Sequence, residues 1–71
     1  MIDITMVKPR SPRSVRIYSE KQDPHFANVE VSNSRTGKTE KHFIVASDAP
    51  QWQGRYEREG FEVSIQKQTT Q

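Results

Sequence analysis

The sequence predicts an α+β fold in which one helix packs on one face of a small antiparallel sheet. None of the 71 residues is leucine, whereas Val and Ile supply eleven of the twenty-two apolar residues. Because leucine is favoured in packed helices and β-branched residues favour pleated surfaces, this composition argues against a helical bundle. Apolar and polar residues alternate with period two in several stretches, and one stretch carries helix start and stop signals. We therefore expect three to four strands and one helix, in the order β-β-β-α-β.

Size and composition exclude several classes of protein. The longest uninterrupted apolar run, Phe43–Ala46, is far shorter than the roughly 20 residues that span a bilayer. Disulfides and thiolate-bound zinc are excluded because the chain has no cysteine. The net charge of +2 favours neither a strongly basic nucleic-acid binder nor an acidic DNA mimic. We expect a soluble, cytoplasmic protein with a single domain.

Both ends of the chain are expected to be flexible. Met1–Val7 allows at most a short edge strand, and the following Pro9 and Pro12 remove ladder donors and favour extended backbone. The polar stretch beyond Ile65 has nothing to bury, so it should fray. The chain is therefore divided into a flexible, basic, proline-containing arm over residues 1–14, one α+β domain over residues 15–66 and a flexible tail over residues 67–71.

Four stretches alternate with period two and are expected to be half-buried strands. They cover residues 15–18, 27–32, 39–46 and 61–65. In the third stretch, we expect Phe43 to face the core. In the last, Phe61, Val63 and Ile65 are expected to point inward together. Gly37, in the loop before the third stretch, can take the positive φ that a hairpin turn often requires.

The single helix is expected between the third and fourth strands. Ser47 or Asp48 can cap its first turn, where Pro50 costs least. Gly60 fits the position just after its C-terminal end. The face expected to be buried follows the spacing i, i+3, i+7 and consists of Ala49, Trp52 and Tyr56. The expected core consists mainly of Trp52, Tyr56, Phe43, Phe61 and Phe26.

No arrangement of residues predicts catalysis or metal binding. The stretch from Gly37 to Thr39 resembles the end of a phosphate-binding P-loop, but the motif's other glycine would stand at Ser32, and a strand rather than a helix follows. His25 and His42 lie apart without a carboxylate cluster beside them. A catalytic acid pair needs a pocket, and a core this small offers no deep one. We expect a binding protein that is not an enzyme and uses no metal or cofactor.

Basic residues point to two candidate binding surfaces. The prolines of the arm hold its charges along an extended backbone, which suits a DNA minor groove or an acidic protein surface. The charges of the arm are Lys8, Arg10 and Arg13. A second group, around the first hairpin, consists of Arg16, Arg35, Lys38 and Lys41. The alternatives are a disordered solubilising end for the arm and a salt-bridged sheet surface for the second group.

The end of the chain resembles a known family. Trp52-Gln53, Tyr56 and the run Gly60-Phe61-Glu62-Val63 close a strand–helix–strand unit. Within residues 43–67, this unit resembles part of the small RNA polymerase inhibitors of lytic coliphages, although the gap between the Trp-Gln pair and the Tyr is longer here. The resemblance implies a sheet-plus-helix domain that docks on bacterial polymerase and blocks promoter complex formation. It also implies basic side chains in and after the final strand; here Lys67 stands at the second such position and Ile65 at the first.

We therefore expect a phage-type regulator that binds the RNA polymerase of its bacterial host, in the host cytoplasm. It would inhibit initiation by blocking σ factor or promoter DNA. The expected partner-binding residues are Lys8, Arg10, Arg13, Arg16, Arg55, Arg58 and Lys67.

The alternative is a small DNA-binding module that uses a three-stranded sheet and a basic arm. It is similar to the arm-binding domains of phage integrases, which lay a three-stranded sheet in the major groove. Its DNA-binding residues would be Arg35, Lys38 and Lys41. DNA readers need basic or amide side chains on the exposed sheet face. The acidic residues on this sheet favour a protein partner; they are Glu20, Glu30, Glu40 and Glu62.

Overall fold

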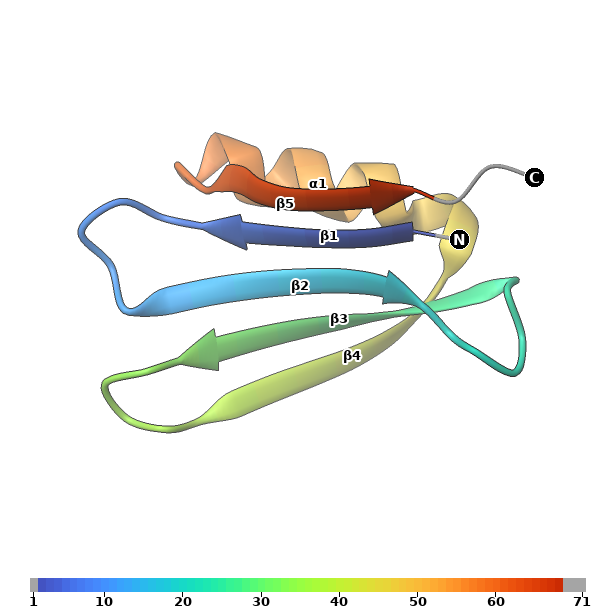
Figure 1. The fold of residues 1–71 in the computed structure, drawn as a ribbon, viewed down its shortest axis with the longest axis horizontal. Helices are drawn as coiled ribbons and strands as arrows, with labels where there is room; N and C mark the ends of the chain where they lie inside the picture. The colour runs from blue at the N-terminus through green and yellow to red at the C-terminus, as the bar shows by residue number, and fades with distance from the viewer. Residues whose placement is uncertain (1, 69–71) are drawn as a thin grey trace.

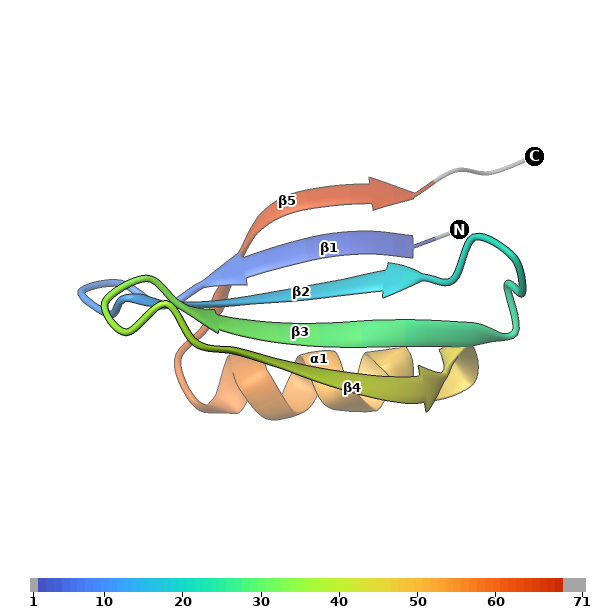
Figure 2. The same ribbon diagram turned by 90° about the horizontal axis from the view of Figure 1, so that it is seen from below.

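Five antiparallel strands and one helix make up the fold, which a computed structural model describes over residues 2–68 (Figure 1). The strands are β1 (Ile2–Val7), β2 (Arg13–Ser19), β3 (Phe26–Asn33), β4 (Thr39–Val45) and β5 (Glu62–Gln68). One 3-10 turn, η1 (Ala46–Asp48), leads into the helix α1 (Ala49–Arg58). The strand order across the sheet is β4-β3-β2-β1-β5, so α1 carries the chain from one edge to the other (Figure 2). The predicted α+β class with a single helix is confirmed.

Residues 2–7 form a strand inside the sheet, which corrects the expected flexible arm. β1 lies between β2 and β5, and its Met6 is opposite Val15. Met6 is fully buried and Ile4 nearly so. Burying a side chain of this size stabilises the fold by about 2 kcal/mol. The strand count of three to four was therefore too low, and the prolines that argued for an arm lie in the turn after β1.

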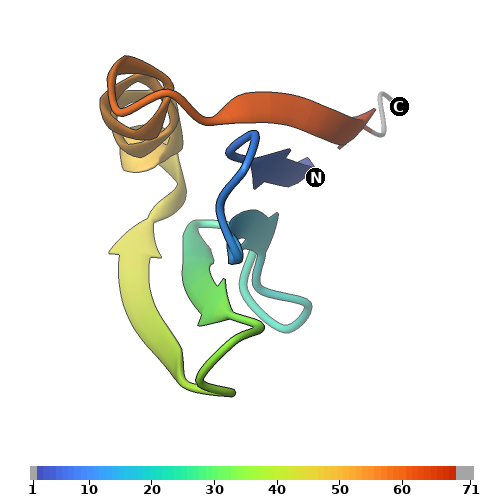
Figure 3. The same ribbon diagram turned by 90° about the vertical axis from the view of Figure 1, so that its left-hand side faces the viewer.

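The core lies between the concave face of the sheet and α1. Figure 3, viewed along the strands, shows the sheet curving around the helix, which lies between its two edges. The buried apolar residues are Ile4, Met6, Val15, Ile17, Ala27, Val29, Val31, Ile44, Ala49, Tyr56 and Phe61, with Trp52 packed against them. The expected helix face is thus the one that packs on the sheet.

β4 turns the opposite face to the core from the one expected. Ile44 is 9% exposed, whereas Phe43 is 63% and Val45 46% exposed. The Phe43 ring stacks on Phe26 with 5.0 Å between ring centroids, on the outer face of the sheet. β4 has apolar residues on both faces, so its own alternation does not settle its orientation. Its pairing with β3 does, because Ile44 lies opposite the buried Ala27.

A β-bulge in β5 corrects the expectation that its apolar residues share one face. Thr5 of β1 lies opposite Ile65, but the next residue, Met6, lies opposite Val63, so Ser64 is an extra residue. An extra residue shifts the alternation by one position. Ile65 is consequently on the outer face and 52% exposed.

The helix ends agree with the sequence in part. Pro50 occupies the first turn, but neither Ser47 nor Asp48 makes the side-chain cap hydrogen bond that we expected, and η1 precedes the helix instead. Gly60 has φ +107°, and the Phe61 amide donates to the Tyr56 carbonyl oxygen at 3.1 Å. Of the expected C-terminal tail, residues 67 and 68 belong to β5, while residues 69–71, like residue 1, lie outside the described residues.

Candidate functional site

Three turns meet at one end of the molecule. The β1–β2 turn, the β3–β4 turn and the α1–β5 turn all lie at the left of Figure 1. The side chain of Lys8, in the first of these turns, lies close to Gly60 in the third. A Cβ atom added to Gly60 would be 3.4 Å from Lys8 Cε. Residues that are far apart in the sequence are therefore neighbours at this end.

The β1–β2 turn holds its basic residues in a defined conformation. Arg10 has φ 63°, in the left-handed region, and is exposed. The Ser11 amide donates to the Lys8 carbonyl oxygen at 3.1 Å, and Ser11 Oγ accepts from the Arg13 amide at 3.2 Å. Pro9 and Pro12 restrict the same segment, since each fixes its own φ. What was expected to be a flexible arm is a turn anchored at both ends by strands.

The β3–β4 turn is organised by Asn33. Its Oδ1 accepts from the Arg35 amide at 2.9 Å and from the Thr36 amide at 3.3 Å. Its carbonyl oxygen accepts from the Gly37 amide at 2.8 Å, and its own amide donates to the Lys38 carbonyl oxygen at 2.9 Å. Gly37 has φ +74°, as predicted. These bonds leave the side chains of Arg35 and Lys38 exposed.

The two turns are bonded to each other. The Ser34 amide and Ser34 Oγ both donate to the Pro12 carbonyl oxygen, at 2.9 and 3.1 Å. Arg13 lies opposite Asn33 in the β2–β3 ladder. We call the resulting surface the basic end; it consists of Lys8, Arg10, Arg13, Arg35 and Lys38.

Positive charge predominates at the basic end, where Glu40 of β4 shares a hollow with Arg13 and Lys38. Neither residues 8–13 nor residues 33–38 include an Asp or Glu. Within residues 2–68, no ion pair involves any of the five cations. The guanidinium of Arg13 lies 5.7 Å from the centroid of the Phe61 ring. Such a surface attracts a polyanion or an acidic protein surface.

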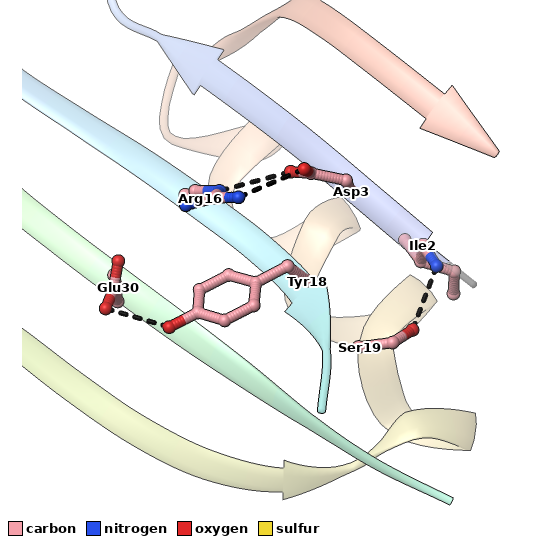
Figure 4. A network of polar contacts seen from close by, with 6 residues as sticks. All are labelled: Ile2, Asp3, Arg16, Tyr18, Ser19 and Glu30. Carbon is pink, nitrogen blue, oxygen red and sulfur yellow. Dashed lines mark hydrogen bonds and ion pairs between the residues drawn. The ribbon is translucent and has the colours of Figure 1, made fainter. Parts of the chain in front are cut away.

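Arg16, expected to bind a partner, belongs to a different surface. It lies on the outer face of the sheet, opposite the helix, and its guanidinium makes two hydrogen bonds of 3.1 Å to the Asp3 carboxylate (Figure 4). It also lies over the Tyr18 ring, 4.4 Å from the centroid. The hydrogen bonds to Asp3 raise the pKa of Arg16 further above its usual value. Its charge is therefore matched within the chain.

The rest of this outer-face network is also paired internally. Tyr18 donates its hydroxyl hydrogen to Glu30 at 2.9 Å, and burial, then this bond, raises the pKa of Tyr18 (Figure 4). Asn28, 2% exposed, donates to Glu20 at 2.9 Å. An open hollow of about 530 Å³ lies over the network, lined by three cations and three carboxylates among other residues; these are Arg16, Lys21, Lys41, Asp3, Glu20 and Glu30. The balance of charge indicates a salt-bridged sheet surface.

The remaining candidate residues are distributed over three places. Arg58 is exposed in the last turn of α1, at the same end of the molecule as the basic end, and Arg55 lies 6.0 Å from the Trp52 ring centroid. Lys41 lies opposite Glu30 on the outer face. Lys67 is in β5, in register with Asp3, and its side chain lies outside the described part of the structure. The structure thus unites Lys8, Arg10 and Arg13 with Arg35 and Lys38, which the sequence had assigned to two rival functions.

Among residues 2–68, no three His, Asp or Glu side chains are grouped closely enough to hold a metal ion. The described helix is too short and too polar to cross a membrane.

Comparison of the chain with protein-family models, with curated proteins and with solved structures found no match.

Proposed function

We propose that the protein is a non-enzymatic regulator of transcription that binds bacterial RNA polymerase through the basic end. The observation that carries this proposal is the joining of two basic turns by hydrogen bonds from Ser34 to Pro12, with no carboxylate in either turn. Predominantly positive charge on a stable scaffold speeds encounter with an acidic surface and orients the bound partner.

The mechanism we propose is steric and electrostatic. The two turns are fixed by several hydrogen bonds to backbone atoms, so the backbone that carries the cations loses little conformational freedom on binding. A domain held on polymerase in this way would occupy space needed by σ factor or promoter DNA. The proposed setting is the cytoplasm of a bacterial host, where a phage-encoded regulator meets polymerase.

The corner between α1 and β5 supports the resemblance to coliphage polymerase inhibitors. Gly60 ends the helix and Phe61 enters the core, as that resemblance implies for a strand–helix–strand unit. Ile65 stands where the family has a basic residue, so the docking surface we propose is the basic end and not the final strand. Arg58, at the same end, extends that surface.

Binding rather than catalysis is proposed because four of the titratable groups that line the outer-face hollow are hydrogen-bonded in pairs. Arg16 with Asp3, and Tyr18 with Glu30, form hydrogen bonds of 2.9–3.1 Å. A catalytic acid or base needs a substrate within hydrogen-bond reach and a pocket that excludes water.

DNA binding is the second candidate, and the same basic end favours it. Arg35 and Lys38 adjoin the β1–β2 turn, and phosphate contacts from Lys and Arg supply most sequence-independent affinity. The sheet face itself suits a groove poorly, because Glu20 and Glu30 accompany Lys41 there. A DNA complex would therefore use the turns.

A pull-down from bacterial lysate at low salt tests the proposal, with polymerase subunits identified by mass spectrometry. We expect the wild-type protein to recover the polymerase subunits and Arg35→Glu to recover about tenfold less. A tenfold weaker affinity corresponds to a loss of about 1.4 kcal/mol of binding free energy, which is what we expect when one charge contact at the interface is lost. Lys21→Glu is the matched control, because Lys21 is an exposed loop cation at the opposite end of the molecule. Recovery of no polymerase by the wild type, or equal loss in both variants, would contradict the proposal.

A further inference from the structure

β4 is an open edge of the sheet. Within residues 2–68, it pairs with β3 on one side and with no strand on the other. All of its residues except Ile44 are exposed. Its seven residues pair with β3 without a register shift, so the free backbone groups form a regular row. A regular open edge is a template for pairing with another strand.

The other edge of the sheet is protected. β5 contains the bulge at Ser64. A bulge is one of the usual means of blocking association at an edge strand. β4 carries the charged Glu40 and Lys41 but lacks a bulge, and its Phe43 is 63% exposed. The two edges therefore differ in their capacity to accept a strand.

The rows of side chains across the outer face define what would fit beside β4. One row runs Arg16, Glu30 and Lys41, alternating in charge from strand to strand. A carboxylate in the next position would continue that alternation, since opposite charges on facing strands attract. Two other rows end at β4 in Phe43 and Val45, which are apolar and exposed, so apolar side chains would fit beside them.

We propose that β4 accepts an extended segment of a partner protein as a sixth strand of the sheet. The segment carries a carboxylate beside Lys41 and apolar side chains beside Phe43 and Val45, on alternate positions. Backbone hydrogen bonds supply affinity in such strand addition, and the alternate side chains supply specificity. This proposal is independent of the basic end.

A second copy of this chain does not meet the same requirement. In a two-fold antiparallel pairing of β4 with itself, outer-face residues lie opposite outer-face residues. Those residues are Thr39, Lys41, Phe43 and Val45, and none is a carboxylate. Lys41 would therefore face a neutral or a like-charged side chain.

Backbone amide NMR of the ¹⁵N-labelled protein tests the proposal with two synthetic peptides. The first probe is Thr-Glu-Thr-Val-Thr-Val-Thr, and the second replaces its Glu by Lys. Each peptide is also used with its sequence reversed, so that both parallel and antiparallel pairing with β4 are covered. We expect one order of the Glu peptide to shift the amides of residues 39–45 but not those of β5, and to bind about 2- to 5-fold more tightly than the Lys peptide.

The matched variant exchanges the charge at the site. Lys41→Glu should reverse the preference between the two peptides, whereas Arg58→Glu, in the last turn of α1, should leave it unchanged. Absence of shifts in residues 39–45 at millimolar peptide would overturn the proposal, as would equal binding of both peptides. Shifts of β4 that grow with protein concentration without peptide would instead identify a second copy as the occupant and equally overturn it.

Discussion

The orientation of β4 gives a quantitative prediction about stability. Ile44→Ala removes a side chain that is 9% exposed and packed in the core, while Phe43→Ala removes one that is 63% exposed. Truncation of a buried Ile costs about 2–5 kcal/mol through lost transfer energy and the cavity left behind. Phe43 loses chiefly its stack on Phe26, at 5.0 Å between centroids, and such pairs contribute about 0.5–1.5 kcal/mol. We expect Ile44→Ala to be the more destabilising by about 2 kcal/mol.

Urea denaturation followed by tryptophan fluorescence measures this difference through the single Trp52. With a slope of about 1 kcal/mol per molar urea, as for small proteins, 2 kcal/mol separates the two midpoints by about 2 M. Ile44→Val, expected to cost about 0.5–1.5 kcal/mol, keeps the test readable if the alanine variant does not fold. A larger loss for Phe43→Ala than for Ile44→Ala would refute the orientation of β4 and the description of its outer face.

Three further predictions concern backbone conformation, pH and ion pairing. Gly54→Ala, in the middle of α1 and with open space for the added Cβ, should stabilise the protein by about 0.5–1 kcal/mol, whereas Gly37→Ala, at φ +74°, should destabilise it by about 1 kcal/mol. Urea midpoints that move in the same direction for both variants would contradict this prediction. The raised pKa values of Tyr18 and Tyr56 mean that folding favours the protonated phenols, so stability should fall as pH rises above about 10. Tyr18→Phe should lessen that fall in urea titrations from pH 9 to 12, and an unchanged slope would contradict the raised pKa of Tyr18. Arg16→Gln should cost no more than about 1 kcal/mol, because its pair with Asp3 is partly exposed, and a loss of several kcal/mol would show that the outer-face network is essential to the fold.

Local signals in the sequence predicted the helix well. Pro50 in the first turn, the spacing of Ala49 and Tyr56, and Gly60 after the last turn all act within a few residues, and the structure confirms each. The strands β2 and β3 were likewise predicted from their own alternation. Such features depend on near neighbours in the chain, which the sequence displays directly.

What the sequence did not predict depends on contacts between distant segments. Ile4 and Met6 become core residues only because β2 and β5 flank β1. The bulge at Ser64 is set by the register of β5 against β1, and no residue type near it signals a bulge. The basic end likewise arises when Ser34 meets Pro12 across 22 residues of sequence. Two groups of cations that supported rival functions in the sequence are one surface in the structure.

Promoter-dependent transcription by purified bacterial RNA polymerase, with and without a stoichiometric amount of this protein, tests the central claim most directly. A gel shift on the same DNA without polymerase is run beside it, and Arg35→Glu and Lys21→Glu are compared in both assays. The proposal predicts loss of transcript without a DNA shift, relieved by Arg35→Glu and retained with Lys21→Glu. A DNA shift by the protein alone would support the DNA-binding alternative, and unchanged transcription would contradict the proposed regulation of polymerase.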